Sequence, residues 1–216
     1  MKQLERYEKY RKAGEQLHGK LADRALDHER ALDTASLLGI QTDGAEVAYA
    51  SEHEFFAHFE CLLYEYPIDG RTAVDRYRSE VGGETPVEED LLSAMVTSRT
   101  SLFRARGSDP ITGTVTLSDM IEDVPDIELT DRNFAMNHST NVAVFLRVLR
   151  FDEFAMSSGV AFPFPTGITD DLLSVYNDVR EKTSRPDSLA RFVTFYRLYK
   201  AHGDPIRMAP VTENSE

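Results

Sequence analysis

The stretch formed by residues 55–78 constrains the fold most, because two apolar helical patterns meet there through a short polar turn. Apolar side chains recur at intervals of three and four before the turn, which predicts a helix with a wide buried face. Ser51 and Glu54 precede this pattern in the spacing of a capping box, so the helix is expected to begin there. The expected core residues of this helix are Phe55, Phe56, Phe59, Leu62, Leu63 and Tyr66.

Each residue of the turn after this helix has a structural role. Pro67 ends the helix, because the residue before a proline is displaced from the helical conformation, and Asp69 with Gly70 is a turn signal. Thr72 and Asp75 repeat the capping pattern and begin a second helix. The carboxylates and arginines here could also form an acid–base or phosphate site, but a turn, a cap and surface ion pairs are the favoured interpretation. The predicted structural motif comprises Tyr66, Pro67, Asp69, Gly70, Arg71, Thr72 and Asp75.

Length, hydropathy and cysteine content limit the class of protein. The chain has 216 residues, which is enough for one large domain or two small ones. It has no apolar run of about 18 residues, the length that a membrane-spanning helix needs, and its charged N-terminus has no apolar signal region. Its single cysteine, Cys61, excludes an internal disulfide. We therefore expect a cytoplasmic protein without a membrane segment.

The charge balance is strongly acidic, with 37 acidic against 24 basic residues and a net charge of -13. Nucleic-acid binding needs a basic surface, so this balance disfavours it. Acidic surfaces with few lysines suit a salt-rich cytoplasm, where dissolved ions screen charge repulsion. The sequence therefore favours a protein partner over a nucleic acid, and it raises the hypothesis of salt adaptation.

The N-terminal arm, residues 1–39, is predicted to form one long helix or a broken pair, with a thin apolar stripe between charged flanks. Such a stripe packs on another helix. That helix could belong to the same molecule or to a second copy, in a homodimer formed through residues 1–38. The sequence leaves both arrangements open.

A metal site is one alternative for the histidines. Glu15 and His18 have the Glu-x-x-His spacing of carboxylate-bridged metal bundles, and the core helix could add His53, Glu54 and His58. His53 and His58 are five positions apart and therefore lie on different helix faces, which makes solvated or capping histidines the favoured interpretation. We predict no metal and no cofactor.

Near residue 98 the apolar pattern changes from a helical period to alternation, which indicates β-strands. The segment formed by residues 142–151 is apolar on both faces and should be central. Short strands joined by turns over about 60 residues predict a small, curved antiparallel β-barrel. The expected strands cover residues 101–106, 113–117, 126–129, 142–151 and 155–162.

Helical patterns flank this barrel on both sides, so the predicted class is α+β, with a long N-terminal helix and a C-terminal helical pair. The predicted organisation is an N-terminal helical arm (1–39), a helical segment (40–98), the barrel (99–165), C-terminal helices (166–203) and a polar tail (204–216).

Two hypotheses about function are a module that binds another macromolecule and an enzyme that acts on a small substrate. The favoured one is a non-enzymatic interaction module, which binds another macromolecule in a groove between the barrel and the helices. The alternative is a hydrolase or metal-assisted enzyme that uses acids from the barrel turns, namely Asp119, Asp123 and Asp126, with His138 nearby. Acids in turns are ordinarily turn formers, which disfavours this alternative.

A third hypothesis is RNA binding through arginines on the strands. Arg104 and Arg106 share one face of the first strand, and Arg147 lies on the central strand. Such a basic patch could hold RNA or an acidic segment of a partner. Surface ion pairs in an acidic protein are the simpler explanation.

Several short motifs occur in an order that resembles a family of uncharacterised microbial proteins, many of which carry a C-terminal SEC-C zinc motif. The motifs are Tyr66-Pro67 with Asp69-Gly70-Arg71-Thr72, then Ser101-Leu102-Phe103, Leu117-Ser118-Asp119-Met120-Ile121 and Gly159-Val160-Ala161-Phe162-Pro163. The resemblance covers residues 55–165 and implies a shared fold without implying an activity. The chain lacks the cysteines of a SEC-C motif, so the resemblance does not extend to zinc binding.

Overall fold

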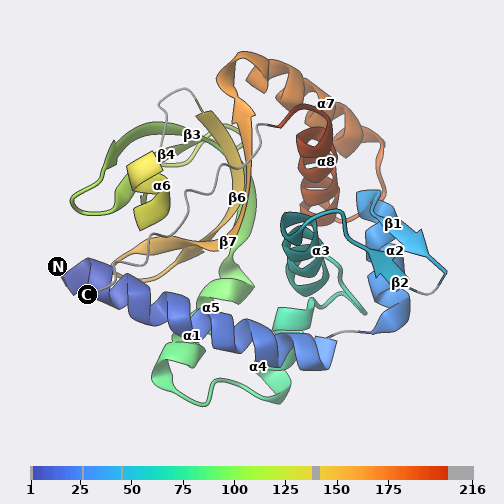
Figure 1. Cartoon of the computed structure of the whole chain (residues 1–216), viewed down its shortest axis with the longest axis horizontal. Coiled ribbons are helices and arrows are strands. Elements are labelled where there is room, and N and C mark those ends of the chain that lie inside the picture. The colour runs from blue at the N-terminus through green and yellow to red at the C-terminus, as the bar shows by residue number, and fades with distance from the viewer. Residues whose placement is uncertain (1, 26, 45, 138–141, 204–216) are drawn as a thin grey trace.

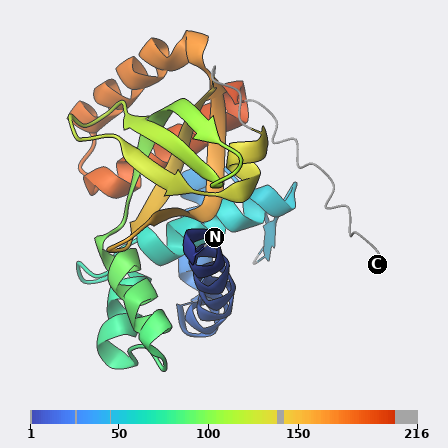
Figure 2. The ribbon, with the colours of Figure 1, turned by 90° about the vertical axis from the view of Figure 1, so that its left-hand side faces the viewer.

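The computed structural model describes residues 2–25, 27–44, 46–137 and 142–203, and it confirms the α+β class (Figure 1). A closed sheet occupies the upper left of Figure 1, and helices lie beside and below it. Figure 2 shows the N-terminal helix, in blue, on one side of this sheet and an orange helix on the opposite side. No helix in the described part of the chain is long and apolar enough to cross a membrane. The predicted polar tail, residues 204–216, lies outside the described residues.

The helices have the following bounds in chain order: α1 (Lys2–Ala25), α2 (His28–Leu38), α3 (Glu52–Tyr64), α4 (Ala73–Glu80), α5 (Pro86–Thr97), α6 (Arg132–Asn137), the 3-10 helix η1 (Thr166–Ile168), α7 (Thr169–Lys182) and α8 (Asp187–His202).

The N-terminal arm is a broken pair of helices rather than one long helix. Asp27 caps α2 by accepting a hydrogen bond from the Arg30 amide. The apolar stripe of α1 packs within the molecule against α3, α4 and α5, where Leu17 and Leu21 are fully buried. A homodimer through residues 1–38 stays a prediction, and it would have to use the mostly charged face that α1 leaves exposed.

A small hairpin, β1 (Gln41–Asp43) with β2 (Glu46–Ala48), lies at the start of the predicted helical segment (40–98), where no strand was expected. Strands this short show too little alternation for the sequence to reveal them. Asp43 and Glu46 face each other across the hairpin, and Tyr49 follows β2 directly.

The turn between α3 and α4 is held by its own hydrogen bonds. Asp69 and Gly70 have φ angles of 50° and 77°, and Ile68 and Arg71 exchange two backbone hydrogen bonds of 2.9 and 3.0 Å. The Thr72 hydroxyl accepts a hydrogen bond from the Asp75 amide, and the Asp75 carboxylate accepts one from the Thr72 amide. The predicted capping box is therefore complete. These hydrogen bonds define the turn that joins α3 to α4.

Each expected strand of the sheet is present: β3 (Arg99–Asp109), β4 (Thr114–Asp119), β5 (Ile127–Thr130), β6 (Val142–Arg150) and β7 (Ala155–Pro165). They pair in the closed order β3-β4-β5-β7-β6, and β6 pairs with β3. The prediction of a wholly antiparallel arrangement is wrong at one position, because β5 and β7 run parallel. A closed ring with an odd number of strands cannot alternate in direction throughout, so one pair has to be parallel.

An aromatic core joins the C-terminal helical pair to the sheet. The ring of Phe145, on β6, stacks between Phe195 of α8 at 4.5 Å and Phe162 of β7 at 5.9 Å. Phe192 and Tyr196 complete this layer, and all of these side chains are buried. The short helix α6 was not predicted; Asp131 caps it by accepting from the Phe134 amide.

Candidate functional site

The acids proposed for a hydrolase do not converge on one place. The Asp119 side chain is fully buried, and its Oδ1 atom accepts hydrogen bonds from the Ser101 hydroxyl and from two amides of the following turn. Asp123 and Asp126 are exposed, and His138 lies outside the described residues. Asp119 therefore stabilises a turn, and the described residues hold no group of three or more His, Cys, Asp or Glu side chains that could bind a metal.

The three arginines of the predicted basic patch lie in different environments. Arg106 is exposed, Arg104 is half-buried, and Arg147 is only 2% exposed. A surface patch cannot include Arg147, because its guanidinium lies beneath α3. The structure thus leaves two of the three arginines for contact with a ligand.

Arg147 instead forms a buried ion cluster with two glutamates of the α3 segment. Its Nε atom donates to Glu60 at 3.1 Å, and its terminal nitrogen donates to Glu65. Ser158 donates to the Glu60 carboxylate at 2.7 Å, and the Tyr64 ring lies 4.2 Å from the guanidinium carbon. These contacts fasten the C-terminal half of α3 to β6 and β7.

Burial controls the ionisation of this cluster. It raises the pKa of Glu60 and of Glu65, and the single Arg147 guanidinium opposes that rise only in part, because it serves both carboxylates. Burial also raises the pKa of the nearby Cys61 thiol, which makes this cysteine a poor nucleophile. The side chains of Arg147, Glu60 and Glu65 are at most 5% exposed, so the cluster is a structural joint between α3 and the sheet.

The histidines and Glu15 also fail to form one site. His18 hydrogen-bonds the Tyr64 hydroxyl at 2.9 Å, His53 the Ala161 carbonyl at 3.0 Å, and His58 the hydroxyl of Tyr49 at 2.7 Å, whereas Glu15 is exposed. Burial lowers the pKa of His18 and of His58 to about 4, so both rings are neutral at neutral pH. Each histidine serves as a separate hydrogen-bonding group.

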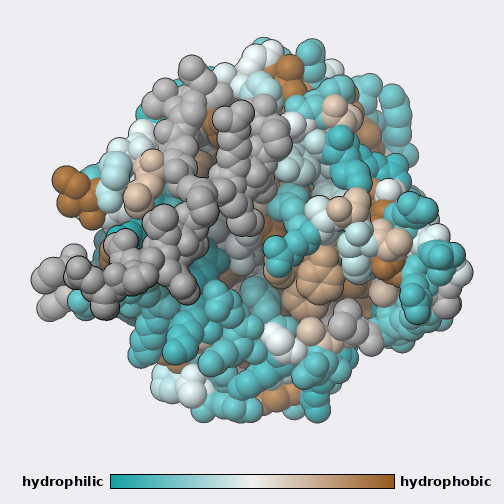
Figure 3. All heavy atoms as spheres, in the orientation of Figure 1, coloured by the Kyte–Doolittle hydropathy of each residue, from teal (hydrophilic) through white to brown (hydrophobic). Residues whose placement is uncertain are grey.

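A group of exposed aromatic side chains lies at the start of α3. Phe55 is 43% exposed, Phe56 44% and Tyr49 38%, so the prediction that Phe55 and Phe56 belong to the core is wrong. The ring centroids of Tyr49 and Phe55 lie 5.2 Å apart in a T-shaped contact, and those of Phe55 and Phe56 lie 5.4 Å apart. The ring of half-buried Phe59 stacks on Phe55 with a centroid distance of 6.3 Å. We call these four residues the aromatic surface. Figure 3 shows brown atoms among teal ones where α3 and β2 face the viewer.

The frame beneath the aromatic surface is firmly held. Glu54, in the first turn of α3, is 4% exposed, and its carboxylate accepts from the Ala50 amide at 2.6 Å and from the Tyr196 hydroxyl at 3.2 Å. Lys200 of α8 donates to the same carboxylate. Together with the bond between His58 and Tyr49, these contacts hold the start of α3, which carries Phe55 and Phe56.

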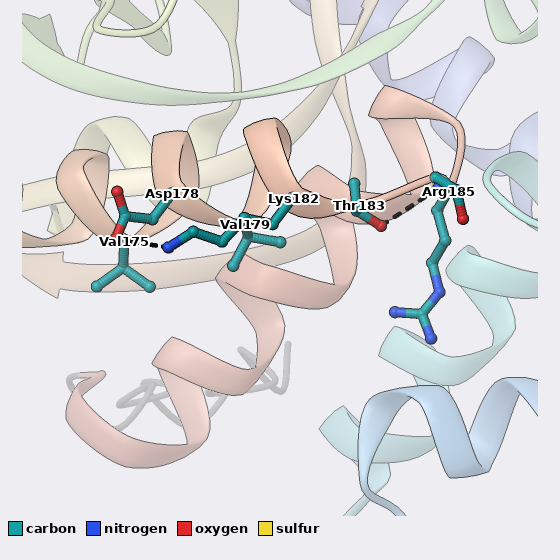
Figure 4. Close-up of a pocket in the computed structure, with 7 residues that line it drawn as sticks. Val175, Asp178, Val179, Lys182, Thr183 and Arg185 are labelled. Carbon is teal, nitrogen blue, oxygen red and sulfur yellow. Dashed lines mark hydrogen bonds and ion pairs between the residues drawn. The ribbon is translucent and has the colours of Figure 1, made fainter.

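A hollow lies along the outer face of α7 and has a volume of about 610 Å³ (Figure 4). Its apolar part consists of the half-exposed Val175 and Val179. Asp178 and Lys182 form an ion pair of 3.5 Å along its wall. Two valines beside a solvated ion pair offer far less apolar area than the aromatic surface, which is therefore the stronger candidate for binding.

Comparison with known proteins defines the family of the chain. No curated protein and no solved structure matches it. Nothing in these comparisons links it to the regions that precede SEC-C zinc motifs. A family profile matches residues 1–209, nearly the full length of the sequence. The chain belongs to the family of unknown function DUF7986.

Proposed function

We propose that the protein is a non-enzymatic interaction module that binds another protein through the aromatic surface. The observation that carries this proposal is the exposure of adjacent Phe55 and Phe56 at 43% and 44% beside the half-exposed Tyr49. Contiguous exposed apolar patches mark interaction sites, and aromatic residues are enriched at the centres of protein interfaces. Burying each phenylalanine against a partner stabilises the complex by roughly 2 kcal/mol.

Rigidity and charge support the same proposal. The bonds of Glu54 and of His58 hold the start of α3 and the Tyr49 hydroxyl, so little backbone conformational entropy is lost on binding. The net charge of -13 disfavours a nucleic-acid partner.

We place the module in the cytoplasm. The resemblance of residues 55–165 to regions upstream of SEC-C motifs stays a prediction about the fold alone.

The proposal is tested by affinity capture of the tagged protein from an extract of its native host. The wild-type chain is expected to retain a stoichiometric protein partner after nuclease treatment. The variant with Phe55→Ser and Phe56→Ser should bind it at least about 30-fold more weakly, because truncating a hot-spot residue typically costs about 2 kcal/mol or more. Capture is quantified by mass spectrometry.

The control variant carries Val175→Ser and Val179→Ser, which make the same kind of change on the exposed face of α7. It should retain the partner. An empty capture with the wild-type chain, or a partner that both variants retain equally, would contradict the proposal.

Salt adaptation is a further part of this proposal, motivated by the excess of 37 acidic over 24 basic residues. If the surface is adapted to a salt-rich cytoplasm, the melting temperature should rise between low and molar potassium chloride, because screening relieves charge repulsion. Differential scanning calorimetry measures this directly. A melting temperature that stays constant or falls with added salt would exclude the adaptation.

A further inference from the structure

The groups around the aromatic surface carry negative charge. Glu52 is exposed and precedes Phe55 by three residues and Phe56 by four, so it lies on the same face of α3 one turn earlier. Asp43 and Glu46 are also exposed and face each other across the β1–β2 hairpin. Strand geometry places Glu46 about 10 Å along the chain from Tyr49.

Two basic groups that contact the same elements add no net positive charge to this surface. Lys200 reaches the first turn of α3 but is neutralised by Glu54. His58, which bonds Tyr49, is neutral at neutral pH, since burial lowers its pKa to about 4. Like charges that face each other across a hairpin destabilise it, so a cation brought to Asp43 and Glu46 by a partner would relieve that repulsion.

We infer that the aromatic surface binds a protein segment in which apolar side chains alternate with arginine or lysine. The apolar side chains pack against Phe55 and Phe56, and the cations lie over exposed aromatic faces and beside Glu52 and the hairpin acids. The inference rests on the proposed function and names the chemistry of the partner. A second copy of this chain is a poorer occupant at low salt, because two molecules with a net charge of -13 then repel each other.

Selection from a library of short random peptides tests the inference on the full-length chain. Peptides are selected on the immobilised wild-type protein and counter-selected on the variant with Phe55→Ser and Phe56→Ser. The expected result is enrichment of sequences that combine arginine or lysine with large apolar residues. Their affinity should fall as the salt concentration rises.

A charge reversal at the rim provides the second measurement. Glu52→Lys should weaken the binding of a selected basic peptide about three- to tenfold. Glu181→Lys, an equal reversal at an exposed position of α7, should leave it unchanged. Glu52 makes no side-chain contact that α3 needs for its cap, which is supplied by Ser51, so the variant is expected to fold.

The outcomes separate the two claims. The enriched peptides could depend on Phe55 and Phe56 and yet be neutral or acidic, or bind the Glu52→Lys variant as tightly as the wild type. Either result would overturn the inference of a basic partner and leave the aromatic surface as a binding site. Failure to enrich any peptide that depends on Phe55 and Phe56 would overturn both claims. Concentration-dependent self-association of the wild-type chain that Phe56→Ser abolishes would identify a second copy as the occupant and overturn the inference.

Discussion

Replacing Arg147 with methionine is expected to lower the free energy of unfolding by about 3–5 kcal/mol, because it leaves buried carboxylates without their cation. Methionine has a similar length, so little packing is lost, and the effect comes from Glu60 and Glu65. Both glutamates bond the guanidinium from positions with almost no exposure to solvent. Urea denaturation at neutral pH measures the loss.

The matched control is Arg106→Met on β3, where the side chain is exposed and a change of no more than about 0.5 kcal/mol is expected. A second comparison adds Glu60→Gln and Glu65→Gln to Arg147→Met. This triple variant should recover part of the lost stability, since it removes the buried charges. An equal, small effect at Arg147 and Arg106 would contradict the role of the buried cluster.

The free energy of unfolding that Arg147→Met loses should depend on pH. Burial raises the pKa of Glu60 and of Glu65 above the ordinary value. The stability contributed by such a group is fully present below its unfolded pKa, and it is lost as pH rises through the folded pKa. Without Arg147 both folded pKa values rise further, so the deficit relative to wild type should be largest at neutral pH and shrink on acidification. A deficit that is independent of pH would contradict this account.

Phe145→Ala is expected to cost about 3–5 kcal/mol, because it opens a cavity in a close-packed aromatic layer. The Phe145 ring is fully buried and stacks on Phe195 of α8 at 4.5 Å, so its loss should also loosen the contact between α8 and the sheet. The control is Phe55→Ala, the same truncation at a ring that is 43% exposed, which should cost less than about 1 kcal/mol. Denaturant unfolding compares the two variants, and similar losses would contradict the assignment of core and surface.

The sequence predicts the elements of this fold well where a periodic pattern is long enough to see. Alternation or, in β6, a continuous apolar run marks every strand from β3 to β7, and a proline with a capping box marks the break between α3 and α4. The β1–β2 hairpin and α6 are missed because three to six residues carry too little periodicity. The parallel pairing of β5 with β7 is a property of the closed ring, and no local pattern encodes it.

The roles of the arginines and of the exposed aromatic residues are set by contacts between residues that are distant in sequence. Arg147 meets Glu60 and Glu65 across separations of 87 and 82 residues. A signal was nevertheless present, because an arginine in the middle of an apolar strand and glutamates within an apolar helix each need a buried partner of opposite charge. Periodicity cannot show which part of a wide apolar face is covered, and for this reason Phe55 and Phe56 were predicted to be buried.

The most direct test of the central claim is site-specific photo-crosslinking in the native host. A photoreactive phenylalanine analogue replaces Phe56 in the aromatic surface or, as the control, Val179 on the exposed face of α7. The account predicts a discrete protein adduct from position 56 and none of comparable yield from position 179. The absence of an adduct at position 56, or the same adduct in equal yield from both positions, would contradict the claim that the aromatic surface binds a protein.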